Sequence, residues 1–180
     1  MTGAVFLDRD GTLVEDPGYL HEPDQVRLLP GAGEAVARLN RGGWVVVTVS
    51  NQSGIARGKY TVADYRAVQR RITDLLAAVG AKLDGSFFCP HHPDVTGPCP
   101  CRKPGIKLFE DAREALGIDL ASSFYIGDRL SDLQPARHYG GRALLVRTGE
   151  GAHHEAGART LGAAVVDDLA AAVDRILETR

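Results

Sequence analysis

Two carboxylates separated by a single residue follow a short apolar run near the start of the chain. Val5, Phe6 and Leu7 lead directly into Asp8 and Asp10, and a glycine comes next. The run indicates a buried strand, because it is too short for a helix and ends at a turn signal. Residues i and i+2 of an extended chain point the same way, so both carboxylates can face the space beyond the strand. Two like charges this close need a cation between them or a proton on one of them, which indicates a magnesium site that contains a nucleophile.

The two carboxylates suit different chemical roles. Asp8 is expected to be ionised at neutral pH, and it can attack phosphorus to form an aspartyl-phosphate, which divides one displacement into two easier ones. Asp10 can give a proton to the leaving oxygen and later take one from the attacking water. A phosphorylated receiver module without enzymatic turnover is the alternative. Asp10 counts against it, because a proton carrier beside the nucleophile speeds hydrolysis of the aspartyl-phosphate.

Polar side chains also follow two later apolar runs. Ser50 and Asn51 come after the run at 44–49, and Asp128 follows the run at 123–126. The carboxyl ends of parallel strands share one edge of a sheet, where ligands bind. A hydroxyl and an amide at that edge can donate hydrogen bonds to the equatorial oxygens of a transferring phosphoryl group. Asp8, Asp128 and a backbone carbonyl near Asp10 are expected to supply the oxygen ligands that Mg²⁺ prefers.

Two basic residues stand before a predicted helix that begins near Pro104. Lys103 offers a compact positive charge for the phosphoryl oxygens, and Arg102 can fork onto a hydroxyl or a second phosphate. A solvated basic pair is the alternative, and it is disfavoured once the carboxylates and Ser50 are considered together. Asp132 is either support for the site or an ordinary first-turn acid.

A second group of residues suits a different metal. All three cysteines of the chain fall within residues 89–101, together with two histidines. Three cysteines and one histidine form a known set of ligands for structural zinc, and the predicted ligands are Cys89, His91, Cys99 and Cys101. His91 is favoured over His92, because a Cys-x-His pair matches the spacing of the Cys-x-Cys pair. These spacings are shorter than the common two-residue spacing, so unligated thiols are the alternative.

Strand-like runs alternate with helical patterns along the chain. Strands are predicted at 5–7, 44–49, 85–89, 123–126, 143–146 and 164–166, and helices at 30–40, 61–79, 104–116, 130–139 and 169–178. Such alternation predicts an α/β fold, a Rossmann-like three-layer sandwich with a central parallel sheet. A chain of 180 residues is expected to form a single domain over 1–180. The polar, Gly/Ala-rich stretch around His153 and His154 is expected to be exposed, and no element is predicted there.

The overall composition narrows the class of protein. A net charge of -2 without a basic run argues against nucleic-acid and membrane surfaces. The chain contains no apolar stretch of about 18 residues and no signal peptide at its start, so we expect a cytoplasmic protein. Three cysteines in such a chain favour thiols or metal ligands over a disulfide framework. We also expect a monomer that acts on a small molecule.

Four motifs resemble those of the haloacid dehalogenase (HAD) superfamily of phosphatases. In order, they are the segment 8–12, the strand that ends at Ser50, the pair Lys103-Pro104 and the pair Gly127-Asp128. The resemblance implies a HAD-like fold with Asp8 as the nucleophile and Asp10 as the acid and base. It also implies phosphate contacts from Ser50 and Lys103, and Mg²⁺ held by Asp8, Asp10 and Asp128. The gaps after Asp10 and Ser50 are too short for a large cap domain.

Within this superfamily the chain is similar to a small capless branch of heptose bisphosphate and histidinol-phosphate phosphatases. The loop 89–101 resembles the zinc loop of both groups, whereas the segments 18–21 and 50–58 resemble the heptose group. The implied reaction is hydrolysis of the C7 phosphate of D-glycero-D-manno-heptose 1,7-bisphosphate, a step toward nucleotide-activated heptose. Arg129, which stands where a lysine is expected, resembles the histidinol group, so histidinol phosphate or another small phosphorylated metabolite is the alternative. The branch implies substrate contacts from Asp16, Tyr19, Asn51, Gln52, Ser53, Arg57 and Arg102.

Overall fold

Six parallel strands form the centre of the fold, in the order β3-β2-β1-β4-β5-β6. The computed structural model describes residues 2–179. The strands are β1 (Ala4–Leu7), β2 (Val45–Asn51), β3 (Gly85–Cys89), β4 (Phe124–Gly127), β5 (Arg142–Val146) and β6 (Ala164–Val166). The chain first builds outward from β1 to β3 and then crosses back to β4. This reversal between β1 and β4 is the topological switch point at which doubly wound sheets bind ligands.

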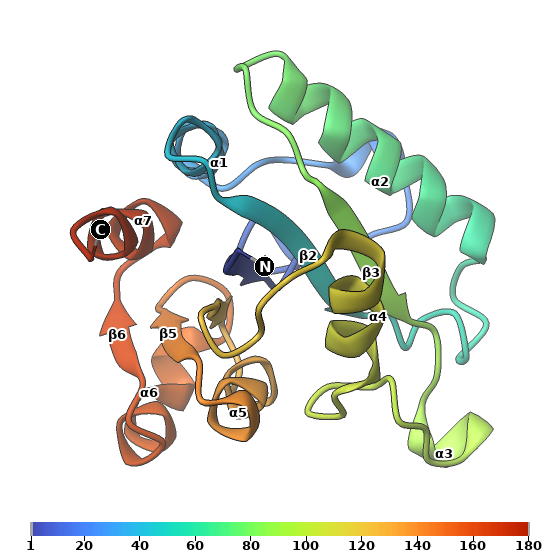
Figure 1. The fold of residues 1–180 in the computed structure, drawn as a ribbon. Coiled ribbons are helices and arrows are strands. Elements are labelled where there is room, and N and C mark those ends of the chain that lie inside the picture. Colours follow the sequence, from blue (N-terminus) through green and yellow to red (C-terminus); the bar gives the residue numbers. More distant parts are fainter. Residues whose placement is uncertain (1, 180) are drawn as a thin grey trace.

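Helices cover both faces of the sheet, as Figure 1 shows. One face carries α1 (Ala32–Arg41), α2 (Val62–Ala77) and α7 (Leu169–Leu177). The other carries α4 (Lys107–Leu116), α5 (Leu130–Tyr139) and α6 (Gly151–Thr160). Two short turns of helix, η1 (Pro23–Gln25) and α3 (Pro93–Thr96), lie within loops. This arrangement confirms the predicted three-layer α/β sandwich.

Strand β1 is buried on both faces, which explains why its sequence is uniformly apolar. Val5 and Leu7 belong to the core beneath α1, α2 and α7, whereas Ala4 and Phe6 belong to the core beneath α4 and α5. The ring of Phe6 packs edge-on against Phe109 of α4, with ring centroids 5.1 Å apart. A central parallel strand between two helical layers has to be apolar on both sides. The strand is thereby anchored, and its carboxyl end presents the residues that follow it.

A capping box marks the start of α2. The hydroxyl of Thr61 accepts a hydrogen bond from the backbone N–H of Asp64, and the Asp64 carboxylate accepts one from the backbone N–H of Thr61. This reciprocal capping box satisfies two backbone donors that have no partner within the helix. The helix ends at Ala77, two residues before the predicted boundary.

Helix α6 is a difference from the sequence prediction. Its contacts are made by very small residues, because Ala158 is buried and Gly157 packs so closely on Leu130 that a Cβ would lie 2.7 Å from that side chain. Arg147 Nε also donates to the carboxylate of Glu155 at 2.6 Å. Small residues produce almost no hydrophobic periodicity, so the sequence gives no signal for this helix.

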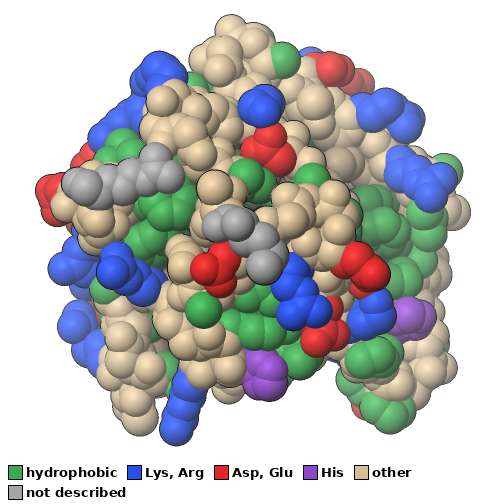
Figure 2. Space-filling model, viewed as in Figure 1, with side chains coloured by type: hydrophobic (Ala, Val, Ile, Leu, Met, Phe, Trp, Pro, Cys, Tyr) green, Lys and Arg blue, Asp and Glu red, His purple; other side chains and the backbone are tan. Residues whose placement is uncertain are grey.

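The connections between the elements carry no inserted cap domain within residues 2–179. In the same range, every helix is too short or too polar to cross a bilayer. Acidic and basic side chains lie interspersed over the face shown in Figure 2, with hydrophobic groups in separate patches. Such a surface agrees with the small net charge of the chain.

The packing of α1 yields a test of the fold. Leu39 is fully buried in the core that α1, α2 and α7 share. Leu39→Ala should lower the free energy of unfolding by about 2–5 kcal/mol, because it removes buried methyl groups and leaves a cavity. Urea unfolding monitored by circular dichroism measures this change. Val79 is 48% exposed, and Val79→Ala should change the value by less than about 0.5 kcal/mol. Equal effects of the two substitutions would contradict the packing described here.

Candidate active site

A cleft of about 430 Å³ opens at the carboxyl edge of the sheet, beside the switch point. Asp8 follows β1 and lines the cleft, and Lys103 reaches it from the loop before α4. The other charged residues of its lining are Asp10, Asp16, Arg102, Arg129 and Asp132. Residues far apart in the sequence therefore meet where the strand order reverses, as predicted from the polar strand ends.

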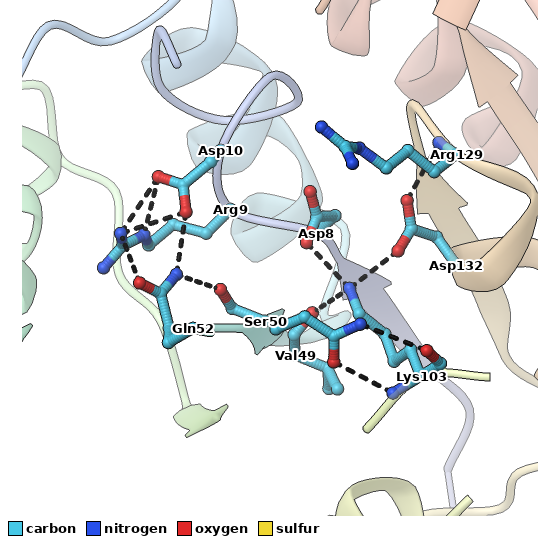
Figure 3. Close-up of polar contacts among 10 residues, drawn as sticks. Asp8, Arg9, Asp10, Val49, Ser50, Gln52, Lys103, Arg129 and Asp132 are labelled. Carbon is cyan, nitrogen blue, oxygen red and sulfur yellow. Dashed lines mark hydrogen bonds and ion pairs between the residues drawn. The ribbon is translucent and has the colours of Figure 1, made fainter. Parts of the chain in front are cut away.

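Lys103 lies between two carboxylates at the base of this cleft (Figure 3). Its Nζ is 2.7 Å from Asp8 Oδ1 and 2.8 Å from Asp132 Oδ1, and it also donates to the carbonyl of Val49. Burial by itself would lower the pKa of Lys103, but the charges of Asp132 and Asp8 raise that pKa above its usual value. The lysine is therefore a buried cation. Both alternatives for Asp132 are observed, because its Oδ1 contacts Lys103 and its Oδ2 accepts the backbone N–H of Arg129 at the start of α5.

Asn51 fixes the main chain of this lysine. The Asn51 side-chain amide donates to the carbonyl of Lys103 at 3.1 Å, and its oxygen accepts from the N–H of Lys103 at 2.9 Å. Bonds to the N–H and the carbonyl of one residue hold the lysine by its backbone and leave its ammonium group free for the carboxylates. Asn51 also lines the cleft.

Three carboxylates crowd together beside the lysine. Asp8, Asp128 and Asp132 each offer an oxygen within 4.8 Å of the other two. Burial raises the pKa of Asp8 well above its usual range; Lys103 opposes this, and the charges of Asp132, Asp128 and Asp10 add to it. Burial likewise raises the pKa of Asp128 to about 6. Carboxylates that are this costly to ionise are typical of a site for a divalent cation.

The environment of Asp128 fits a cation. Its Oδ2 accepts the backbone N–H of Glu150 at 2.9 Å, while its Oδ1 is buried without a hydrogen-bond partner among residues 2–179. Gly11 and Gly149 enclose this carboxylate so closely that a Cβ on either would lie within 2.4 Å of Asp128 Oδ2. Both glycines have positive φ angles, which side chains disfavour. The cradle therefore leaves one oxygen of Asp128 for a ligand other than the protein.

Asp10 is held by a residue that the sequence analysis did not single out. Arg9 is completely buried, and its Nε and Nη2 each lie 3.0 Å from an oxygen of the Asp10 carboxylate (Figure 3). The Gln52 amide donates to the same carboxylate at 2.7 Å. With its side chain engaged in this way, Asp10 would reach a cation site through its main chain, and ligation by a backbone carbonyl near Asp10 stays a prediction. Residue 9 lies beyond the end of β1, so strand alternation carries no signal for the burial of Arg9.

The remaining predicted residues lie either in the lining of the cleft or outside it. Asp16, Tyr19, Gln52, Ser53 and Arg102 line the cleft, together with Asn51. Ser50 is buried, and its hydroxyl accepts a hydrogen bond from Gln52. Arg57 lies outside the cleft lining, where its Nη2 is 2.8 Å from Nε2 of His92.

Three residues with polar side chains and no predicted role also line the cleft: Tyr60, Arg129 and Ser131. Tyr60 also donates a hydrogen bond to Gln52. Tyr19 adopts a left-handed backbone conformation with φ 53°, which is uncommon for a residue other than glycine.

The predicted zinc ligands lie together. The Sγ atoms of Cys89, Cys99 and Cys101 are 3.1–3.6 Å apart, and Nδ1 of His91 lies 3.3 Å from Cys101 and 3.7 Å from Cys89. Tetrahedral zinc, with bonds of roughly 2.3 Å to sulfur and 2.0 Å to nitrogen, separates its ligand atoms by about 3.5–3.8 Å. The four residues therefore fit a zinc ion. His92 instead contacts Arg57 and caps α3.

Hydrogen bonds connect this cysteine cluster to the cleft. The backbone N–H of Gln52 donates to the carbonyl of Cys89 at 2.8 Å, and that of Ala56 to the carbonyl of Pro90 at 3.1 Å. Arg102 Nη1 is 3.4 Å from the carbonyl of His91. Since Cys101 directly precedes Arg102 and Lys103, the cluster holds both sides of the cleft base.

Known proteins with similar sequences and structures are phosphatases. A family model described as HAD-hydrolase-like matches residues 100–172. The D-glycero-beta-D-manno-heptose-1,7-bisphosphate 7-phosphatase of Escherichia coli O6:H1 is 43% identical over 153 residues, covering 82% of this chain and 80% of that protein. The enzyme of the same name from Photorhabdus laumondii is 44% identical, covering 85% of each chain.

Solved structures agree with these relatives. A D,D-heptose 1.7-bisphosphate phosphatase from B. bronchiseptica, complexed with magnesium and phosphate, has a TM-score of 0.90 and 37% identity, covering 99% of this chain and 100% of that chain. A D,D-heptose 1,7-bisphosphate phosphatase from Burkholderia thailandensis has a TM-score of 0.75 and 35% identity, covering 98% and 99%.

The two adjacent histidines of the cysteine loop yield a matched test of the zinc site. The wild-type protein should contain about one zinc per chain, measured by atomic absorption. His91→Ala should lose most of the zinc and unfold at a lower temperature, because a structural zinc contributes directly to folding. His92→Ala keeps all four ligands and should retain the metal. Equal zinc content in the two variants, or a folded wild type without zinc, would contradict the assignment.

Proposed function

Because the chain belongs to the family of D-glycero-beta-D-manno-heptose-1,7-bisphosphate 7-phosphatases within the HAD-like hydrolases, we propose that it hydrolyses the C7 phosphate of that sugar bisphosphate. The observation that carries the proposal is the pairing of Asp8 with the buried Lys103 at the base of the cleft. A carboxylate with a fixed cation beside it suits attack on a phosphate ester better than any other chemistry of this cleft. The identity of 43% with an enzyme named for this reaction supports the choice of substrate.

We assign the reaction to Asp8 and Asp10 in two steps. In the first, an oxygen of Asp8 attacks phosphorus, the bond between phosphorus and the C7 oxygen breaks, and Asp10 gives its proton to that oxygen. In the second, water attacks the phosphorus of the aspartyl-phosphate, Asp10 takes a proton from the water, and the Asp8 carboxylate is released with inorganic phosphate. Asp10 ends the cycle in the protonation state in which it began.

The basic residues of the cleft suit the charges of a bisphosphate. Lys103 lies where it can neutralise charge on the equatorial oxygens of the transferring phosphoryl group. Arg102 and Arg129 line the same cleft, and their planar guanidinium groups suit the second phosphate or the sugar hydroxyls. Asp16, Tyr19 and Ser53 offer further polar contacts to the sugar.

We propose Mg²⁺ and zinc as the two metals of the enzyme. Asp8, Asp128 and the main chain near Asp10 would hold Mg²⁺, which, when bound, offsets the repulsion between the Asp8 carboxylate and the incoming phosphate. The unpartnered Oδ1 of Asp128 supports this site. Cys89, His91, Cys99 and Cys101 would hold a structural zinc.

We further propose a cytoplasmic monomer. The charged residues that line the cleft all come from one chain, so the proposed chemistry needs no second copy. The three cysteines form no disulfide and suit a reducing compartment.

A panel of phosphate esters tests the substrate. Measured by phosphate release, kcat/KM should be highest for the β anomer of the heptose bisphosphate. We expect lower kcat/KM values for its α anomer, fructose 1,6-bisphosphate and histidinol phosphate. Asp8→Asn should lower kcat by at least about 1,000-fold without unfolding the protein, because it removes the nucleophile. Asp94, whose side chain is 86% exposed, provides the control, since Asp94→Asn should leave kcat unchanged. A preference for histidinol phosphate, or an active Asp8→Asn variant, would overturn the proposal.

The raised pKa of Asp128 yields a test of the magnesium site. The Asp128 carboxyl group has a pKa of about 6 in the metal-free folded protein, whereas the usual value, expected for the unfolded chain, is 3.8. Because folding raises this pKa, the protonated carboxyl group favours folding below about pH 4. That contribution is lost as the pH rises through about 6. At pH 5, Mg²⁺ must displace this proton, whereas at pH 7.5 the carboxylate is already free. Adding Mg²⁺ to chelator-treated protein should therefore raise Tm more at pH 7.5 than at pH 5.

The variant Asp128→Asn should abolish most of this Mg²⁺-induced rise in Tm at both pH values. Ca²⁺, which prefers more ligands and longer bonds, provides a comparison of ion size. An equal rise at pH 5 and pH 7.5 in the wild type would contradict the role of Asp128.

A further inference from the structure

The polar network behind Asp10 is more extensive than holding one carboxylate requires. Gln52 is buried, and its amide nitrogen donates to Asp10 Oδ2 and to the Ser50 hydroxyl. Its amide oxygen accepts from Arg9 Nη2 at 3.2 Å and from the Tyr60 hydroxyl. An amide has two donor hydrogens and two acceptor lone pairs. Gln52 therefore uses its full hydrogen-bonding capacity within the protein.

The Asp10 carboxylate is consequently fixed at both oxygens. Oδ2 accepts from Gln52 and from Arg9 Nη2, and Oδ1 accepts from Arg9 Nε and also lies 3.0 Å from Arg9 Nη2. The Asp10 side chain remains 19% exposed and lines the cleft. Two donors therefore lie close to each oxygen, and the carboxylate meets the cleft in one fixed orientation.

Burial of an arginine side chain is energetically unfavourable. Removing a guanidinium group from water costs several kcal/mol, and an apolar side chain of similar size is often as stabilising or more so. The guanidinium group of Arg9 has a second contact besides its ion pair, because it lies over the ring of Tyr65, 5.2 Å from the ring centroid. Tyr65 on α2, Gln52 after β2 and Asp10 after β1 are thus connected through one side chain.

We propose that Arg9 and Gln52 are positioning residues that aim the Asp10 carboxylate at the leaving oxygen of the substrate. This inference rests on the proposed phosphatase function and assigns Gln52 to Asp10 instead of to direct substrate contact. A carboxylate on a loop can otherwise rotate among several rotamers. A misplacement of about 1 Å can lower a rate by roughly 100-fold. Arg9 and Gln52 remove that freedom without touching the substrate.

Esters with different leaving groups separate positioning from a structural role. An alkyl phosphate needs a proton on its leaving oxygen, whereas p-nitrophenyl phosphate releases a stable phenolate and does not. The quantity kcat/KM reports the first transfer, to Asp8. We expect Arg9→Met and Gln52→Met to lower the ratio of kcat/KM for the best alkyl phosphate to that for p-nitrophenyl phosphate by at least about 10-fold. Asp10→Asn should lower this ratio at least as much.

Arg142 provides the matched control. Its guanidinium lies 5.4 Å above the ring of Phe124, at the opposite end of the sheet from the cleft, so Arg142→Met should leave the ratio unchanged. Arg9→Lys keeps the charge but not the two-point contact, and its ratio should fall between those of wild type and Arg9→Met.

The outcomes separate this inference from the proposed function. Equal losses for both esters in folded Arg9→Met and Gln52→Met would show a merely structural role and overturn the inference. If Arg9→Met does not fold, the ratio for Gln52→Met decides. A wild type that hydrolyses other alkyl phosphates but not the heptose bisphosphate would overturn the proposed substrate and leave the inference open to the same measurement. A wild type that hydrolyses neither class of ester would overturn both.

Discussion

The crowding of buried negative charge at the switch point is the constraint on which the rest of the site depends. Asp8, Asp128 and Asp132 approach one another, and burial raises the pKa of both Asp8 and Asp128. Lys103 balances part of this charge from the position between Asp8 and Asp132. Without that ammonium group, two carboxylates would be left buried and unpaired, which is strongly destabilising. What remains of the negative charge faces the position that a divalent cation would take.

Several elements of the fold position Lys103 and the segment directly before it. Asn51 bonds the backbone N–H and carbonyl of Lys103, and the cysteine cluster lies just before this lysine in the chain. The same cluster accepts hydrogen bonds from the segment after β2. A loop that has little apolar content would thus gain rigidity from the four side chains of the predicted zinc site instead of from a hydrophobic core. The cleft is open, because no cap covers it within residues 2–179, so its specificity depends on loops made rigid in this way.

The sequence predicts most of this arrangement because its strongest signals are local. Continuous apolar runs identify the buried strands, and polar residues directly after Leu7, Val49 and Gly127 mark the shared carboxyl edge. The four cysteine-loop ligands lie within one short segment, so spacing alone brings them to attention. The sandwich fold and the HAD-like family are both confirmed.

What the sequence does not predict depends on contacts between distant segments. Arg9 resembles a solvated charge between two acids, and its burial becomes evident only once Gln52 and Tyr65 are placed around it. Helix α6 packs through Gly157 and Ala158, which carry no hydrophobic signal. Gln52 and Arg57 follow the same strand, yet one faces Asp10 and the other faces the cysteine loop, a distinction that spacing cannot make.

The start of α6 is connected to the cation site. The backbone N–H of Glu150 donates to Asp128, and the hydroxyl of Thr148 donates to the carbonyl of Gly11 at 2.7 Å. Local opening of this weakly patterned helix would release that carboxylate, so cation affinity and the hydrogen-exchange protection of α6 are thermodynamically linked.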